Sequence, residues 1–135
     1  MTWHQVTNME ANNYLLNKIA DTKGLTTISP TWFSIADTDG NISSLASQAY
    51  VTYAHQQGLE VWGLVDNFKE GVSTYETLSK TSSRQRLVNQ LIAAAIQYGL
   101  DGINVDFELI TQDCAKAYIE FIRELSIMCR INGII

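Results

Sequence analysis

The sequence predicts an α/β fold that is built on a parallel β-sheet. Strand-like runs begin near residues 25, 59 and 101, and one helix-like segment separates each run from the next. Neighbouring parallel strands need such crossover connections, whereas antiparallel strands can be joined by a tight turn. The composition is globular, with 46% hydrophobic and 17% charged residues in 135. A chain of this length is sufficient for one domain with a sizeable core.

The first half of the chain contains two helix–strand transitions. Residues 12–24 end in a lysine and a glycine, as helices often do. Residues 25–35 are rich in β-branched and aromatic side chains, which predicts a strand, and a short strand over residues 3–7 can precede them. Residues 43–58 begin with cap-type serines and predict a helix that ends at Gly58. The apolar positions expected on the first helix are Leu15, Leu16, Ile19 and Ala20.

The second half repeats this order. Residues 59–67 predict a buried strand, and residues 82–98 predict the clearest helix, capped near Ser82 or Ser83 and followed by Gly99. Residues 100–110 predict the next strand, and residues 111–133 a long final helix. The segment 37–41, "DTDGN", is typical of a surface turn.

The charge balance excludes several partners. A formal net charge of −5 and a pI near 4.8 argue against a nucleic-acid or an anionic membrane surface. No run approaches the roughly 20 apolar residues of a membrane span, and the N-terminus lacks the features of a signal peptide.

The basic stretch from Arg84 to Arg86 is expected to be a solvated face. Cys114 and Cys129 lie on one predicted helix, roughly 22 Å apart by helical rise, which is too far for a disulfide.

Two architectures fit four βα units, an open doubly wound sheet and a (β/α)₈ barrel. The glycine-rich phosphate loops that often mark nucleotide-binding sheets are missing from the sequence. Their absence favours the barrel, of which four units would be about half.

The stretch "YGLDGINVDFELI", residues 98–110, contains the candidate catalytic residues. If residues 102–108 form a strand, Asn104, Asp106 and Glu108 share one face, while the apolar residues between them face the helices. Glu108 then lies at the carboxyl end, where barrels and open parallel sheets bind substrate. Asp101 precedes the strand and is expected in a turn or in support of the site. Gly102 predicts a close backbone approach or an unusual turn.

Two carboxylates on one face perturb each other, and repulsion raises at least one pKa, so that one carboxyl remains an acid near neutral pH. Glu108 could then donate a proton while Asp106 orients a neighbouring group. The alternative is an aspartate and a glutamate that are solvated, or bound to loop amides, at a strand end. The residues alone leave both interpretations open.

The octapeptide "DGINVDFE" resembles the DGxDxDxE signature of glycoside hydrolase family 18, which lies on the fourth strand of a (β/α)₈ barrel. Asp101, Gly102, Asp106 and Glu108 match the signature, and Asn104 departs from its middle aspartate. The stretches "YGLDGIN", "TWFSIAD" and "VWGLVDN" are similar to the branch of spore cortex-lytic and other cell-wall N-acetylglucosaminidases. The SxGG motif of chitinases is absent, because residues 63–67 read "GLVDN".

The resemblance implies that residues 1–135 are the N-terminal half of a family 18-like catalytic domain. Glu108 would be the general acid and later the base, and Asp106 would orient the 2-acetamido group of the substrate, with Asn104 and Asp101 in support. This substrate-assisted route needs no enzyme nucleophile, and no cofactor or metal is expected. The implied substrate is a polymer of N-acetylglucosamine, with peptidoglycan favoured over chitin.

The same resemblance implies that a tyrosine and an aromatic platform come from the later half of the barrel. The isolated chain is therefore expected to have little or no hydrolase activity. Half a barrel would also leave strand edges unpaired, which predicts self-association. A secreted, cell-envelope or spore-associated location is expected of a protein that acts on such polymers.

Three further residues are candidate substrate contacts, namely Trp32, Asp66 and Asn67. Aromatic rings near a barrel mouth can stack on sugars, but core packing is an equal alternative for Trp32 and the favoured one for Trp62. Asp66 and Asn67 end the predicted third strand and could bind a sugar or cap the strand. His4 is expected to be structural.

Two rival functions remain. A non-catalytic carbohydrate-binding protein on the same fold would have lost the catalytic glutamate, whereas this chain retains Glu108. An unrelated α/β enzyme could instead bind a divalent metal through Asp106 and Glu108.

Overall fold

The computed structural model describes the backbone of residues 1–135 and all side chains except those of Leu15, Leu16 and Ala20. Its sheet has the order β1-β2-β4-β5, in which all neighbouring strands are parallel, and β3 pairs antiparallel with β2. The predicted α/β class and parallel sheet are confirmed. The strands are β1 (Thr2–His4), β2 (Thr27–Ile35), β3 (Ile42–Ser44), β4 (Glu60–Asp66) and β5 (Gly102–Asp106).

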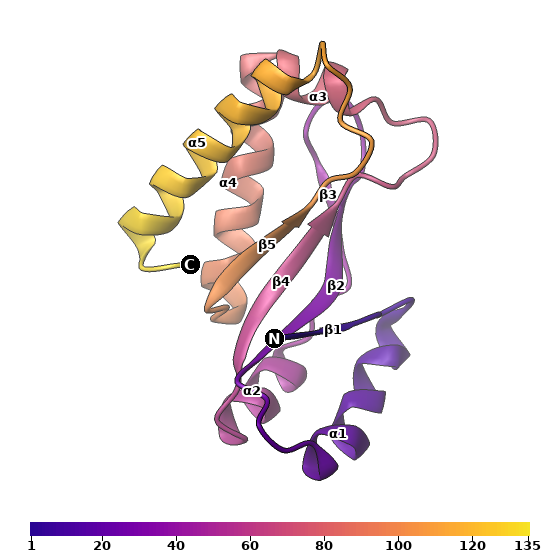
Figure 1. Ribbon diagram of the computed structural model, residues 1–135, viewed down its shortest axis with the longest axis vertical. Helices are drawn as coiled ribbons and strands as arrows, with labels where there is room; N and C mark the ends of the chain where they lie inside the picture. Colours follow the sequence, from indigo (N-terminus) through magenta and orange to yellow (C-terminus); the bar gives the residue numbers. More distant parts are fainter.

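Each connection between successive parallel strands contains helical segments, and α5 follows β5. Helices α4 and α5 lie side by side against one face of the sheet, and the short α3 lies near the carboxyl ends of the strands (Figure 1). The helices are α1 (Leu15–Lys18), α2 (Gln48–Gln56), α3 (Thr74–Ser79), α4 (Thr81–Tyr98) and α5 (Ala115–Asn132), with 3₁₀ helices η1 (Met9–Tyr14) and η2 (Ile19–Asp21). In the described part of the chain, none combines the length and apolar character that a membrane span requires.

The first helical segment differs most from its prediction, because only four of its residues are α-helical. Asparagine side chains compete for backbone groups in η1. The Asn8 carboxamide accepts from the N–H of Ala11 at 2.9 Å, and that of Asn12 donates to the C=O of Met9 at 3.2 Å. The side chains at positions 15, 16 and 20, expected on the apolar face, lie outside the described residues.

The elements β3 and α3 were not predicted. Ser43 and Ser44 were expected to cap a helix, but they belong to β3, and the cap of α2 is Ser47, whose hydroxyl accepts from the N–H of Tyr50. The predicted turn 37–41 joins β2 to β3. Gly40 lies there with φ +86° so close to α4 that an added Cβ would be 2.0 Å from the C=O of Ser83.

Helix ends follow the expected chemistry. Gly99 and Gly133 close α4 and α5 in the left-handed conformation. Helix α4 begins after Lys80, slightly before the serines that were expected to cap it. The two cysteines are free and buried, Cys114 just before α5 and Cys129 near its end, and burial raises the pKa of both thiols.

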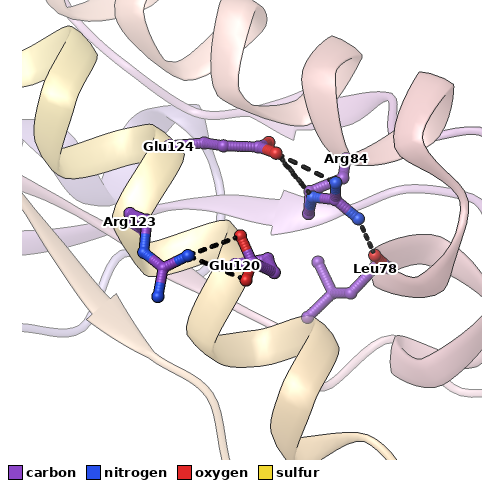
Figure 2. Close-up of polar contacts among 5 residues, drawn as sticks. All are labelled: Leu78, Arg84, Glu120, Arg123 and Glu124. Atoms are coloured by element: carbon purple, nitrogen blue, oxygen red, sulfur yellow. Dashed lines mark hydrogen bonds and ion pairs between the residues drawn. The ribbon is translucent and has the colours of Figure 1, made fainter.

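The arginine stretch is only partly solvated, so the expectation for Arg84 was wrong. Its guanidinium is buried between α3, α4 and α5, where it donates to both carboxylate oxygens of Glu124 and to the C=O of Leu78 at 2.9–3.1 Å (Figure 2). Arg86 is exposed and donates to the C=O of Asp39. Arg84 therefore ties three helices together.

The strands β1 and β5 end the parallel sheet. Beyond α5, the N–H of Ile135 donates to the C=O of Asp101 at 2.9 Å, and the N–H of Ile103 donates to the C=O of Ile135 at 2.8 Å. This is the bonding of a parallel pair with Ile135 opposite Gly102. Ile135 thus pairs with the beginning of β5, and the rest of the outer edge of this strand has no paired strand among the described residues.

Candidate active site

The carboxyl ends of β4 and β5 bring two carboxylates together. Asp66 and Asp106 are the last paired residues of these strands. Both line a hollow of about 280 Å³, which also receives Thr31 and Ser34 from β2. The Asp66 carboxylate accepts from the N–H of Phe68 at 3.1 Å. The hollow therefore has two half-buried carboxylates at one wall and hydroxyl groups at another.

The alternation predicted for β5 is present. Ile103 and Val105 face α5, whereas Asn104 and Asp106 lie on the opposite face of the sheet. The Asn104 carboxamide donates to the hydroxyl of Ser29, a fully buried residue of β2, at 3.1 Å. Asn104 thus braces the inner face of the sheet below Asp106.

The strand ends at Asp106 and not at residue 108, which corrects the predicted boundary. The ring of Phe107 stacks on Phe121 of α5 with centroids 5.3 Å apart, so this residue faces the helices. Glu108 is exposed in the segment that follows. Its position is set through its backbone, because its N–H donates to Asn67 Oδ1 at 2.9 Å and its C=O accepts from Asn67 Nδ2 at 3.0 Å.

Tyr118 packs against the same aromatic cluster, 6.0 Å from the ring of Phe107. Burial raises the pKa of Tyr118, so its hydroxyl stays neutral at physiological pH. The side of residue 107 that faces α5 is therefore apolar and uncharged.

Asp101 does not join the site. It precedes β5, at the opposite end of the strand from Asp106 and about 16 Å away by strand rise. Its carboxylate accepts from the N–H of Val61 at 2.7 Å and pairs with His55 Nε2 at 2.8 Å. The turn alternative for Asp101 is the one observed, and it fixes the start of β5 against β4.

Of the two tryptophans considered, Trp32 takes the core alternative and Trp62 does not. Trp32 is 2% exposed, and its indole N–H donates to the Asn12 carboxamide at 2.7 Å. The pairing of β2 with β4 shifts register between Thr31 and Phe33, so that Trp32 is the extra residue of a bulge. Trp32 is one of the residues that line the hollow, but a side chain this deeply buried has no ring face free for a sugar. Trp62 is only half-buried at the other end of the sheet, where it lies against Gly102 and its indole N–H donates to the Glu60 carboxylate at 3.1 Å, so the favoured core prediction for it was wrong.

Several residues near the site were not predicted, among them Thr31 and Ser34 in the wall of the hollow. Ser29 holds Asn104, Thr74 of α3 accepts from Asn67 Nδ2 at 2.9 Å, and Phe68 lines the hollow with 54% of its surface exposed. A sequence signal existed for Phe68 alone, because an aromatic residue directly after a buried strand lies at the strand exit. Across the described residues, no group of three or more His, Cys, Asp or Glu side chains is arranged to hold a metal ion.

The fold and the family can be compared with known proteins. The model of the family "Glycosyl hydrolases family 18" matches residues 2–134. The "uncharacterized glycosylase YvbX" of Bacillus subtilis (strain 168) is 27% identical over 94 residues, which are 65% of this chain and 27% of that protein. The chain thus spans about a quarter of the length of this curated relative.

Solved structures share the fold at low identity. The C-terminal domain of a putative chitinase from Desulfitobacterium hafniense DCB-2 has a TM-score of 0.84 at 16% identity over 98% of this chain and 42% of that chain. The spore cortex-lytic enzyme SleL of Bacillus megaterium QM B1551 has a TM-score of 0.80 at 18% identity over 98% of this chain and 32% of that chain. The four βα units therefore correspond to part of a (β/α)₈ barrel, and the chain belongs to glycosyl hydrolases family 18.

Proposed function

We propose that this chain is the N-terminal half of a catalytic domain that cleaves β-linked N-acetylglucosamine polymers, with peptidoglycan as the polymer. The observation that carries the proposal is the placement of Asp106 in the wall of the 280 Å³ hollow, with Glu108 two residues beyond it at the strand exit. Membership of family 18 and the likeness to a spore cortex-lytic enzyme support the reaction and the polymer.

In this proposal the Glu108 carboxyl group protonates the glycosidic oxygen as the bond to the anomeric carbon breaks. The carbonyl oxygen of the substrate's own 2-acetamido group attacks that carbon and forms a cyclic oxazolinium ion. Asp106 accepts a hydrogen bond from the acetamido N–H and stabilises the positive charge. The Glu108 carboxylate then takes a proton from water, which opens the ring with overall retention.

The chain alone provides only part of such a site, because it covers 42% of the D. hafniense domain. We expect the 135-residue chain to have little or no activity and to self-associate through its open sheet edge. The decisive test compares the complete gene product with the 135-residue chain on peptidoglycan and on N-acetylglucosamine oligomers. Turnover by the complete product should fall about 10²–10⁴-fold in Glu108→Gln, which is the usual contribution of general acid–base catalysis.

Two other outcomes would replace this proposal. A complete product that binds the oligomers without cleaving them would be a carbohydrate-binding protein. Calorimetric binding of Mg²⁺ or Ca²⁺ that is lost in Glu108→Gln would indicate a metal enzyme instead.

A further inference from the structure

The contacts of Asn67 assign it a role different from sugar binding. Backbone pairing between β4 and β5 stops at Asp66 and Asp106, and Asn67 is the next residue of the first strand. Its carboxamide accepts from the N–H of Glu108 and donates to the C=O of the same residue. A neighbouring strand satisfies a residue with the same two kinds of bond. The side chain thus extends the ladder past the last backbone pair.

These partners leave the amide few bonds to offer a ligand. One Nδ2 hydrogen goes to Glu108 and the other to the Thr74 hydroxyl at 2.9 Å. Both donors are therefore used, and only one lone pair of Oδ1 remains. The orientation of the amide is determined as well, because a backbone N–H can only donate and a backbone C=O can only accept.

The segment that Asn67 holds has little other support at this point. Glu108 and Leu109 are exposed, and Leu109 has φ +53°, which is a strained conformation for leucine. On one side of Glu108, Phe107 anchors the chain against α5. The direction of the Glu108 side chain thus depends on how firmly its own backbone is fixed.

We propose that Asn67 is a positioning residue that fixes the backbone of Glu108 and so aims its carboxyl group at the scissile bond. Thr74, at the start of α3, orients the Asn67 amide for this purpose. We call the two hydrogen bonds from the Asn67 carboxamide to the backbone of Glu108 the clamp. The inference rests on the proposed function, because the clamp affects catalysis only if Glu108 is the general acid. It differs from the prediction that Asn67 binds substrate, because a clamp acts on proton transfer and not on affinity.

The kinetic test uses the complete gene product. Asn67→Ala should lower kcat on an N-acetylglucosamine oligomer about 10–100-fold, since a misplacement of about 1 Å can cost that much, while KM changes less than about twofold. A substrate with a 2,4-dinitrophenyl leaving group needs little acid assistance, so on it the loss should shrink to a few-fold. Asn89→Ala, an exposed asparagine of α4, is the matched control and should change neither parameter.

Conservative variants separate the clamp from a general loss of structure. Asn67→Asp keeps the acceptor for the N–H of Glu108 but loses both donors, so it should resemble Asn67→Ala. Thr74→Val retains both bonds to Glu108 and should lose only a few-fold in kcat. An increase in KM with unchanged kcat in Asn67→Ala would overturn the inference, because it would mean that Asn67 contacts the sugar.

A second measurement is independent of turnover. Hydrogen exchange of the Glu108 amide in the 135-residue chain should accelerate about 10-fold or more in Asn67→Ala, because its acceptor is lost, while the amides of α4 remain as in the unchanged chain. Exchange that does not change would refute the clamp even if the enzyme is active. A complete product without activity would refute the proposed function, and the exchange result would still decide whether Asn67 holds Glu108.

Discussion

Asp66 and Asp106 lie opposite each other at the last paired position of β4 and β5, and both face the hollow at the carboxyl end of the sheet. Their surroundings differ, because Asp66 is engaged by the N–H of Phe68, whereas Asp106 is followed by the segment that carries Glu108. The proposed mechanism therefore assigns them different effects on the reaction.

Substitution of each aspartate by asparagine tests this difference in the complete gene product. Asp106→Asn should lower kcat on N-acetylglucosamine oligomers about 100-fold or more, because the charge that stabilises the oxazolinium ion is lost. Asp66→Asn keeps an acceptor for the N–H of Phe68 and should mainly raise KM. Steady-state kinetics on one oligomer of defined length measure both effects. Equal losses of kcat in the two variants would contradict the assigned roles.

The contact between Gly102 and Trp62 predicts a stability effect. A Cβ on Gly102 would lie 2.6 Å from the indole ring of Trp62. Gly102→Ala should therefore destabilise the chain by about 1–3 kcal/mol through overpacking, as measured by urea denaturation. The smaller side chain in Trp62→Leu makes room for that methyl group. The double variant should be more stable than the sum of the two single losses predicts, and strict additivity would argue against the contact.

The ion pair that joins α4 to α5 should be stronger than a second ion pair within α5. The Arg84–Glu124 pair is largely buried, while the Arg123–Glu120 pair lies on the exposed face of α5 (Figure 2). Arg84→Met should cost about 1–3 kcal/mol of unfolding free energy, because it leaves Glu124 and the C=O of Leu78 without their donor. Arg123→Met should cost less than about 0.5 kcal/mol. Chemical denaturation of both variants checks this order.

His4 predicts a pH dependence of stability. Burial, together with the nearby Lys18 charge, lowers the pKa of His4 from 6.5. Burial raises the pKa of Tyr50, so its hydroxyl remains protonated, and it forms a hydrogen bond with His4 Nδ1 at 3.0 Å. The folded state therefore favours neutral His4, and the unfolded state binds more protons as the pH falls through 6.5. Stability should decrease over that range.

The variant His4→Asn tests this effect, because an amide oxygen can still accept from Tyr50 but does not titrate. Denaturation midpoints between pH 8 and pH 5 should decline less in the variant than in the unchanged chain. Parallel pH profiles would show that His4 is not responsible.

The open edge of β5 predicts self-association of the 135-residue chain. Helix α5 also carries exposed isoleucines, among them Ile119 and Ile131, of which Ile131 is 71% exposed. Light scattering should show species larger than a monomer at high concentration, and Ile119→Lys with Ile131→Lys should reduce them. A clean monomer in the unchanged chain would contradict the prediction.

Most of the fold was predictable because its signals are local. Alternation of strand-like and helix-like runs predicted the parallel sheet, and the two-residue period of a strand placed Asp106 and Asn104 opposite Ile103. Gly99 marked the end of α4 at the correct residue. The segment β3 was missed, because three polar or mixed residues after a turn do not show a strand period.

The tertiary structure decided which of these residues meet. The bulge in β2 turned Trp32 into the core, His55 and the N–H of Val61 engaged the carboxylate of Asp101, and the carboxamide of Asn67 reached a residue 41 positions away. Arg84 is buried for the same reason, since its partner Glu124 is 40 positions distant. The type of secondary structure, and the face of a strand on which a side chain lies, depend on a few adjacent residues. The sequence by itself therefore determined most of these features. Bulges, clamps and buried ion pairs need partners that only the packed chain brings together.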